Sequence, residues 1–114
     1  MLLNLLWSNK KTEAEIEPWR KVLLDAADLI EARGAARYTL EDADGSLCIM
    51  GAVNVAVTGD AWTNGFQEPA AQEARDHFCI SIGEPASWSA CCEFNNHHPK
   101  SEIVAALRAA AHGN

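Results

Sequence analysis

The chain has 114 residues, of which 48% are hydrophobic and 22% charged, and its formal net charge at pH 7 is −7. This length fits one domain with one hydrophobic core, and the apolar content excludes long disordered regions. The excess of acidic over basic residues opposes binding to nucleic acids and anionic membranes, and it suits a protein partner with a basic surface.

The chain opens with an apolar segment that is followed by a polar one. Five of the first seven residues are leucine or tryptophan, and residues 8–17 are mostly polar and acidic. The apolar segment is too short to cross a bilayer and lacks the features of an export signal, so we expect a cytoplasmic protein. We divide the chain into an apolar arm and acidic tether (residues 1–17) and a single globular domain (residues 18–114). The arm is expected to pack against its own domain or against a second copy, as in a homodimer.

Residues 18–33 are predicted to form the first helix of the domain. Pro18 suits the first position of a helix, and Gly34 suits its end. The apolar residues between them recur at helical spacing, namely Trp19, Val22, Leu23, Ala26, Ala27 and Ile30. The glutamates that precede Pro18 favour the positive end of the helix dipole, so we interpret them as structural.

A small β-hairpin is predicted over residues 37–48. Tyr38 and Leu40 alternate with polar residues, and Leu47 starts the returning strand. The pair Asp44-Gly45 between them is typical of tight type I′ turns. A hairpin of this size needs helices packed against it to persist.

Residues 47–58 form the longest apolar run and carry no charge, so we expect them at the centre of the core. The alternating valines of this run suit a strand, whereas its remaining apolar spacing suits a helix that ends at Gly59. We predict a helix over residues 49–58, because burial outweighs the small helix penalty of β-branched residues.

The second half of the chain is predicted to be mainly helical. Residues 59–67 form a loop, Pro69 starts one helix and Pro99 starts the last one. Residues 84–92 are expected to form a short turn of helix or a loop, and residues 94–98 a connection. The predicted fold is α+β and mostly helical, with about four helices packed around a buried central helix and one small β-hairpin.

Cys48 has the local setting that best suits a reactive thiol. At the N-terminus of the helix predicted over residues 49–58, the helix dipole would lower the pKa of the thiol. His97 or His98 would then act as the base, and an asparagine would orient that histidine. The alternative is that Cys48 is a small core residue, and we favour it because a cysteine and a histidine in one chain do not establish proximity.

Four residues provide enough ligands for a zinc site, namely Cys79, Cys91, Cys92 and His97. Their spacing departs from the common zinc patterns, because there is no C-x-x-C motif and His97 is followed directly by a second histidine. We therefore expect that the four cysteines of the chain are reduced and that the protein holds no metal and no cofactor.

Four aromatic residues fall in predicted loops or termini, namely Trp7, Trp62, Phe66 and Trp88. Any that remain exposed are candidate anchors for a protein partner, because aromatic residues dominate the binding energy of many interfaces. The sequence contains no Walker loop, no dinucleotide-binding fingerprint and no G-x-S-x-G motif.

The order of three segments resembles a known family. The helix VLLDAADLIEARG is followed by a DG turn that leads into LCIMGAVNVA, and FNN precedes the closing helix EIVAALRAAA. Over residues 22–111 this order is similar to a family of small uncharacterised domains of actinobacteria and their bacteriophages. The resemblance implies a mostly helical cytoplasmic domain and supplies no catalytic residue. Here FNN is followed by HHPK, which is shorter than the family's usual connection.

These observations lead to three hypotheses for function. The first is a non-enzymatic interaction protein, phage-encoded, that binds a bacterial host protein; it depends on the loop aromatics, the missing catalytic motifs and the resemblance. The second is a small cysteine-dependent enzyme that uses Cys48 with His97 or His98. The third is a structural zinc-binding domain. Neither a nucleic acid nor a membrane is expected as a partner.

Overall fold

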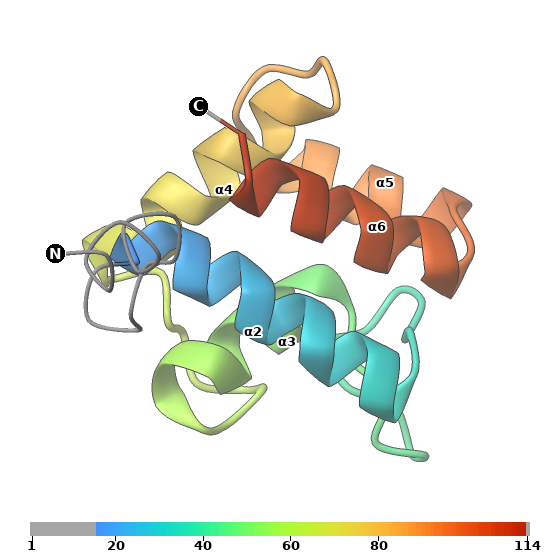
Figure 1. Ribbon diagram of the computed structural model, residues 1–114. Coiled ribbons are helices and arrows are strands. Elements are labelled where there is room, and N and C mark those ends of the chain that lie inside the picture. Colours follow the sequence, from blue (N-terminus) through green and yellow to red (C-terminus); the bar gives the residue numbers. More distant parts are fainter. Residues whose placement is uncertain (1–15, 114) are drawn as a thin grey trace, which may run out of the picture.

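The computed structural model describes residues 16–113, which fold into five α-helices. The helices are α2 (Pro18–Arg33), α3 (Ile49–Thr58), α4 (Pro69–Ser81), α5 (Trp88–His97) and α6 (Lys100–Ala111). Figure 1 shows them stacked against one another, with loops at both ends of α3. The apolar arm predicted at the N-terminus and most of the acidic tether lie outside the described residues.

Helix α2 is the element against which most of the others pack. It begins with a proline at its first position and ends at Gly34, whose N–H donates to the carbonyl of Ile30 at 2.8 Å. One face is buried against α3, α4 and α6, through side chains that include Leu23, Ala27 and Ile30. The predicted bounds of this helix are confirmed, since they depend on a proline start and a glycine end.

Helices α2 and α6 lie side by side and run in opposite directions (Figure 1). At one end the guanidinium of Arg20 donates to the carbonyl of Ala111 at 2.7 Å. Further along, Arg108 of α6 donates to both carboxylate oxygens of Glu31 and to Asp28. The hydrogen bonds from Arg108 to Glu31, together with the positive charge of Arg108, lower the pKa of Glu31.

Helix α3 confirms the choice of helix over strand for residues 49–58. Its N-cap is Cys48, whose sulfur accepts the N–H of Gly51 at 3.3 Å. At the other end Gly59 adopts the left-handed conformation, with φ of 86°, and its N–H donates to Val55. Capping at both ends and burial of the first half therefore outweigh the helix penalty of the valines.

The predicted hairpin over residues 37–48 is wrong. The segment is a loop with two isolated bridges, in which Leu47 pairs with both Ala35 and Glu41. The backbone of Tyr38 has a φ of 61°, which no regular strand contains. The side chain of Asp42 also stabilises the turn. Its carboxylate accepts backbone N–H groups that, in a tight hairpin turn, would not bond to a side chain.

Three further predictions about the fold need correction, namely the extent of α5, the fold class and the position of α3. Residues 94–97 were expected in a connection, but they form the last turn of α5, which begins after the N-cap Ser87. The described residues contain no strand, so the fold is all-helical rather than α+β. Helix α3 is buried along only part of its length, and α2 rather than α3 contacts most of the other helices.

A single cluster of apolar side chains joins the five helices. Its largest fully buried members are Leu23, Ile30, Leu47, Phe78, Ile103 and Leu107. Burying such a side chain contributes about 1.5–3 kcal/mol to stability, so this cluster stabilises the packing of the five helices. Within the described residues, no helix is both long and apolar enough to span a membrane.

Candidate functional site

A pocket of about 290 Å³ lies between the loop of residues 34–48, the start of α3 and one face of α5. We call it the Tyr38 pocket. It is lined by Tyr38, Thr39, Leu40, Cys48, Met50, Cys92, Asn95 and Asn96. None of these residues is charged, whereas the hollows of about 410 and 550 Å³ elsewhere on the surface include carboxylates. An apolar hollow with a few convergent polar groups is the usual form of a ligand-binding site.

The buried side chain of Asn95 connects the three elements that form the pocket. Its oxygen accepts the N–H of Ile49 at 3.1 Å, and its amide group donates to the carbonyl of Ala36 at 2.8 Å. Next to it, the oxygen of Asn96 accepts the N–H of Tyr38 at 3.1 Å. Buried polar groups that are fully paired in this way rigidify a structure, so the loop is fixed to α5.

A close backbone contact joins the same loop to α3. A β-carbon added at Gly51 would lie only 2.1 Å from the carbonyl oxygen of Leu40. The N–H of Cys48 donates to that same carbonyl at 3.2 Å. Only glycine allows the loop to approach the first turn of α3 so closely.

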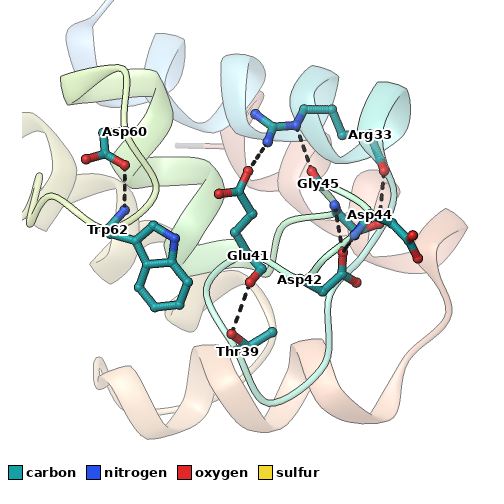
Figure 2. Close-up of polar contacts among 9 residues, drawn as sticks. Arg33, Thr39, Glu41, Asp42, Asp44, Gly45, Asp60 and Trp62 are labelled. Atoms are coloured by element: carbon teal, nitrogen blue, oxygen red, sulfur yellow. Dashed lines mark hydrogen bonds and ion pairs between the residues drawn. The ribbon is translucent and has the colours of Figure 1, made fainter.

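The outer part of the loop is held by a network of polar contacts (Figure 2). The carboxylate of Asp42 accepts the N–H groups of Asp44 and Ser46, both at 3.0 Å. Arg33, at the end of α2, pairs with Glu41 and donates to the carbonyl of Gly45. The loop is therefore fixed at its tip as well as at its base.

Tyr38 occupies a strained position in this fixed loop. It is the one described residue other than glycine with a positive φ, and its side chain is 78% exposed. A left-handed backbone costs about 1–2 kcal/mol in a residue that carries a β-carbon. Strain of this kind persists where the surrounding structure imposes it, and it is concentrated at functional sites.

Cys48 also lines the pocket, but it lacks the partners that a catalytic thiol needs. It is 7% exposed, and burial raises the pKa of its thiol above the ordinary value. His97 and His98 line a separate hollow on a different face of α5. His98 stacks on the ring of Phe94 and forms a hydrogen bond with the carbonyl of that residue. The structure therefore does not bring Cys48 together with either histidine.

The candidate zinc ligands are divided between three places. The sulfurs of Cys79 and Cys91 lie 3.6 Å apart in the core, whereas the sulfur of Cys92 faces the Tyr38 pocket. His97 lies on the surface and pairs with Glu93 at 3.2 Å. In the part of the chain that the structure describes, no three His, Cys, Asp or Glu residues are placed to share a metal ion.

The candidate partner-binding aromatics differ in exposure. Trp62 is 60% exposed, and its backbone N–H donates to the carboxylate of Asp60 (Figure 2). This hydrogen bond lowers the pKa of Asp60. Phe66 and Trp88 are half-buried and pack edge to face, with centroids 3.8 Å apart. Trp7 lies outside the described residues.

The loop that carries Trp62 is fixed in the same manner as the loop that carries Tyr38. The buried side chain of Asn54 donates to the carbonyl of Ala61 at 2.8 Å and accepts the N–H of Gly65 at 2.9 Å. Each of the two loops that flank α3 is therefore held by its own buried asparagine, Asn95 for the loop that carries Tyr38 and Asn54 for the loop that carries Trp62.

The sequence did not point to Tyr38, Asn54 or Asn95. The FNN segment contributed only to the resemblance, because the burial of Asn95 depends on how the elements pack. The exposure of Tyr38 has no local signal, because it depends on the contact between its backbone and Asn96.

The fold and the site define a small all-helical domain with fixed loops around one apolar pocket. The chain belongs to the family of unknown function DUF6197, whose model matches residues 15–113. Searches of curated proteins and of solved structures returned no match.

Proposed function

We propose that this domain is a non-enzymatic interaction protein that binds a partner protein with a basic surface through the Tyr38 pocket. The observation that carries the proposal is the position of Tyr38, which is 78% exposed on a fixed loop at the edge of an apolar pocket. A tyrosine held in this way supplies a large contact area without losing much conformational entropy on binding.

The electrostatics of the loop support a basic partner. Residues 34–48 contain three acidic residues and one basic residue, and the whole chain has a net charge of −7. The carboxylate of Asp44 is on an exposed residue at the tip of the loop, where it is available to an incoming lysine or arginine. Complementary charge of this kind mainly speeds association and excludes wrong partners.

Trp62 extends the proposal to a second contact. It is the other strongly exposed aromatic side chain among the described residues, and its loop is also fixed by a buried asparagine. We expect it to add binding energy if the partner is large enough to contact both loops. Phe66 and Trp88 contribute less, because they pack against each other.

The resemblance to domains of actinobacteria and bacteriophages supports a more specific version of the proposal. In this version the protein is phage-encoded, acts in the cytoplasm and binds a protein of the bacterial host. The acidic charge supports a protein over a nucleic acid or a membrane as the partner.

A photocrosslinking experiment tests the proposal. A photoreactive amino acid is placed at position 38 or, as a control, at Ile80, which is 68% exposed on α4. Irradiation in an actinobacterial cell should give a reproducible adduct with one basic protein from position 38 and not from position 80. Equal adducts from both positions, or none from position 38, would contradict the proposal.

A small cysteine-dependent enzyme is the second candidate function. The observation that favours it is that Cys48 lines the Tyr38 pocket at the N-terminus of α3. The raised pKa of its thiol and the distance of His97 and His98 from the pocket weigh against it. Fast alkylation of Cys48 at neutral pH would support this alternative.

A further inference from the structure

We propose that Cys48, Met50 and Cys92 form a binding site for a soft monovalent metal ion of the Cu(I) class. The proposal is independent of the proposed function. It also differs from the expectation drawn from the sequence, because it includes the thioether of Met50, which was not among the candidate zinc ligands.

The three sulfur-bearing side chains all line the Tyr38 pocket, although they come from two elements. Cys48 and Met50 belong to the start of α3, and Cys92 belongs to α5. The sulfur of Cys92 lies 3.4 Å from the sulfur of Met50. The residues that line the pocket carry no charged group that would compete with the sulfurs for an ion.

The ligand types select the metal. Thiolate and thioether sulfurs are soft ligands that favour Cu(I), whereas structural zinc sites need four nitrogen or sulfur ligands in a tetrahedron. On binding, each thiol bonds to the ion through its sulfur and releases its proton to the solvent. No electron is transferred, so the ion enters and remains as Cu(I).

The start of α3 suits the charge of such a complex. Two thiolates and one Cu(I) ion carry a net charge of −1, and the N-terminus of a helix stabilises negative charge. One of its N–H groups, that of Gly51, already donates to the sulfur of Cys48 at 3.3 Å. Met50 and Cys92 are only half-buried, so the ion has a route into the pocket.

The core cysteines provide a matched contrast within the same chain. The sulfurs of Cys79 and Cys91 lie 3.6 Å apart, but both residues are almost fully buried and neither lines the Tyr38 pocket. Because neither of these thiols is open to the pocket or to solvent, this pair should not bind the ion although its sulfurs are close. Variants of the two places therefore separate a specific site from general thiol affinity.

The test is a competition for Cu(I) alone against bathocuproine disulfonate, in the absence of oxygen. The wild-type protein should remove one equivalent of Cu(I) from the chelator. Met50→Leu, which preserves volume and both thiols, should weaken the affinity about tenfold or more. Cys92→Ser should weaken it further, and Cys79→Ser should leave it unchanged.

X-ray absorption gives a second readout that does not depend on the affinity. The wild-type complex should show a first shell of three sulfur atoms, and the Met50→Leu complex should show two. Circular dichroism shows whether each variant is folded, and Met50→Leu decides the question if a cysteine variant is not. The proposal is overturned if the wild-type protein binds no stoichiometric Cu(I), or if Met50→Leu binds it as the wild-type protein does. It is also overturned if Cys79→Ser abolishes binding.

Discussion

The side-chain oxygen of Asn95 accepts the backbone N–H of Ile49 across 46 residues of sequence, and so joins α5 to the first turn of α3. The amide group of the same side chain holds the carbonyl of Ala36, at the base of the loop that carries Tyr38. One buried asparagine thereby fixes the three walls of the Tyr38 pocket relative to one another. The pocket is formed before any partner arrives, which lowers the entropic cost of binding.

Replacing Asn95 should therefore damage both stability and the pocket. Asn95→Ala leaves the N–H of Ile49 and the carbonyl of Ala36 buried without partners, which should cost about 3 kcal/mol of unfolding free energy. Asn64→Ala is the matched control, because Asn64 is exposed and its side chain accepts one N–H within its own loop. Urea unfolding of both variants tests the difference, and equal costs would contradict the role assigned to Asn95.

Gly51→Ala should destabilise the protein although alanine is the better helix former. The substitution would normally stabilise a helix by about 1 kcal/mol. Here the new β-carbon would lie 2.1 Å from the carbonyl of Leu40, so we expect a net loss of about 2 kcal/mol or more. Amide chemical shifts should change in the loop of residues 34–48.

Gly83→Ala is the control for that substitution. Gly83 has a positive φ, of 80°, which Gly51 lacks, but a β-carbon there would meet no atom within 4 Å. We expect a cost of about 1–2 kcal/mol from the backbone alone, with no shift changes in the Tyr38 pocket. A stable Gly51→Ala variant with an unchanged loop would contradict the close contact.

Helices α2 and α3 could be predicted from local signals, whereas the full length of α5 and the path of the loops could not. Pro18, Gly34 and Gly59 set helix ends through their own backbone preferences, so the sequence was sufficient to place α2 and α3. The path of the loop around Tyr38 depends on Asn96, which is 58 residues away in sequence. The pair Asp44-Gly45 correctly predicted a turn, but the prediction that two strands flank this turn was wrong.

The candidate site was predicted only in part for the same reason. Cys48 was expected at a helix N-terminus, and it is the N-cap of α3. Its distance from His97 and His98 could not be predicted, because it depends on which face of α5 packs against α3. Trp62 is exposed, whereas Phe66, in the loop after α3, packs against Trp88 at the first position of α5.

The thiols should differ in their rates of alkylation in the folded protein. Cys92 is half-buried and should react first, while Cys48, Cys79 and Cys91 should react slowly because each is at most 7% exposed. Timed iodoacetamide labelling with mass spectrometry measures the order. Cys48 reacting fastest near neutral pH would support the thiol-enzyme alternative instead.

Stability should fall in alkaline solution. Burial raises the pKa values of Cys48, Cys91 and Cys92 in the folded state. Because the pKa of each thiol is higher in the folded state than in the unfolded state, the folded protein favours the neutral thiol. The stabilisation that results is fully present below the ordinary thiol pKa of about 8.5 and is lost as the pH rises beyond it. Urea midpoints between neutral pH and pH 10 should therefore decrease, and the decrease should be smaller in Cys91→Ala. A slope that is the same in Cys91→Ala as in the wild type would contradict this assignment.

The most direct test of the proposed function is the affinity of the crosslinked partner for Tyr38→Ala. Once the partner is purified, the substitution should weaken binding by about 2 kcal/mol or more, or about thirtyfold, as expected for an aromatic anchor. Ile80→Ala, which removes another strongly exposed apolar side chain, from α4, should change the binding free energy by less than about 0.5 kcal/mol. Binding that is as tight in Tyr38→Ala as in the wild-type protein would contradict the account.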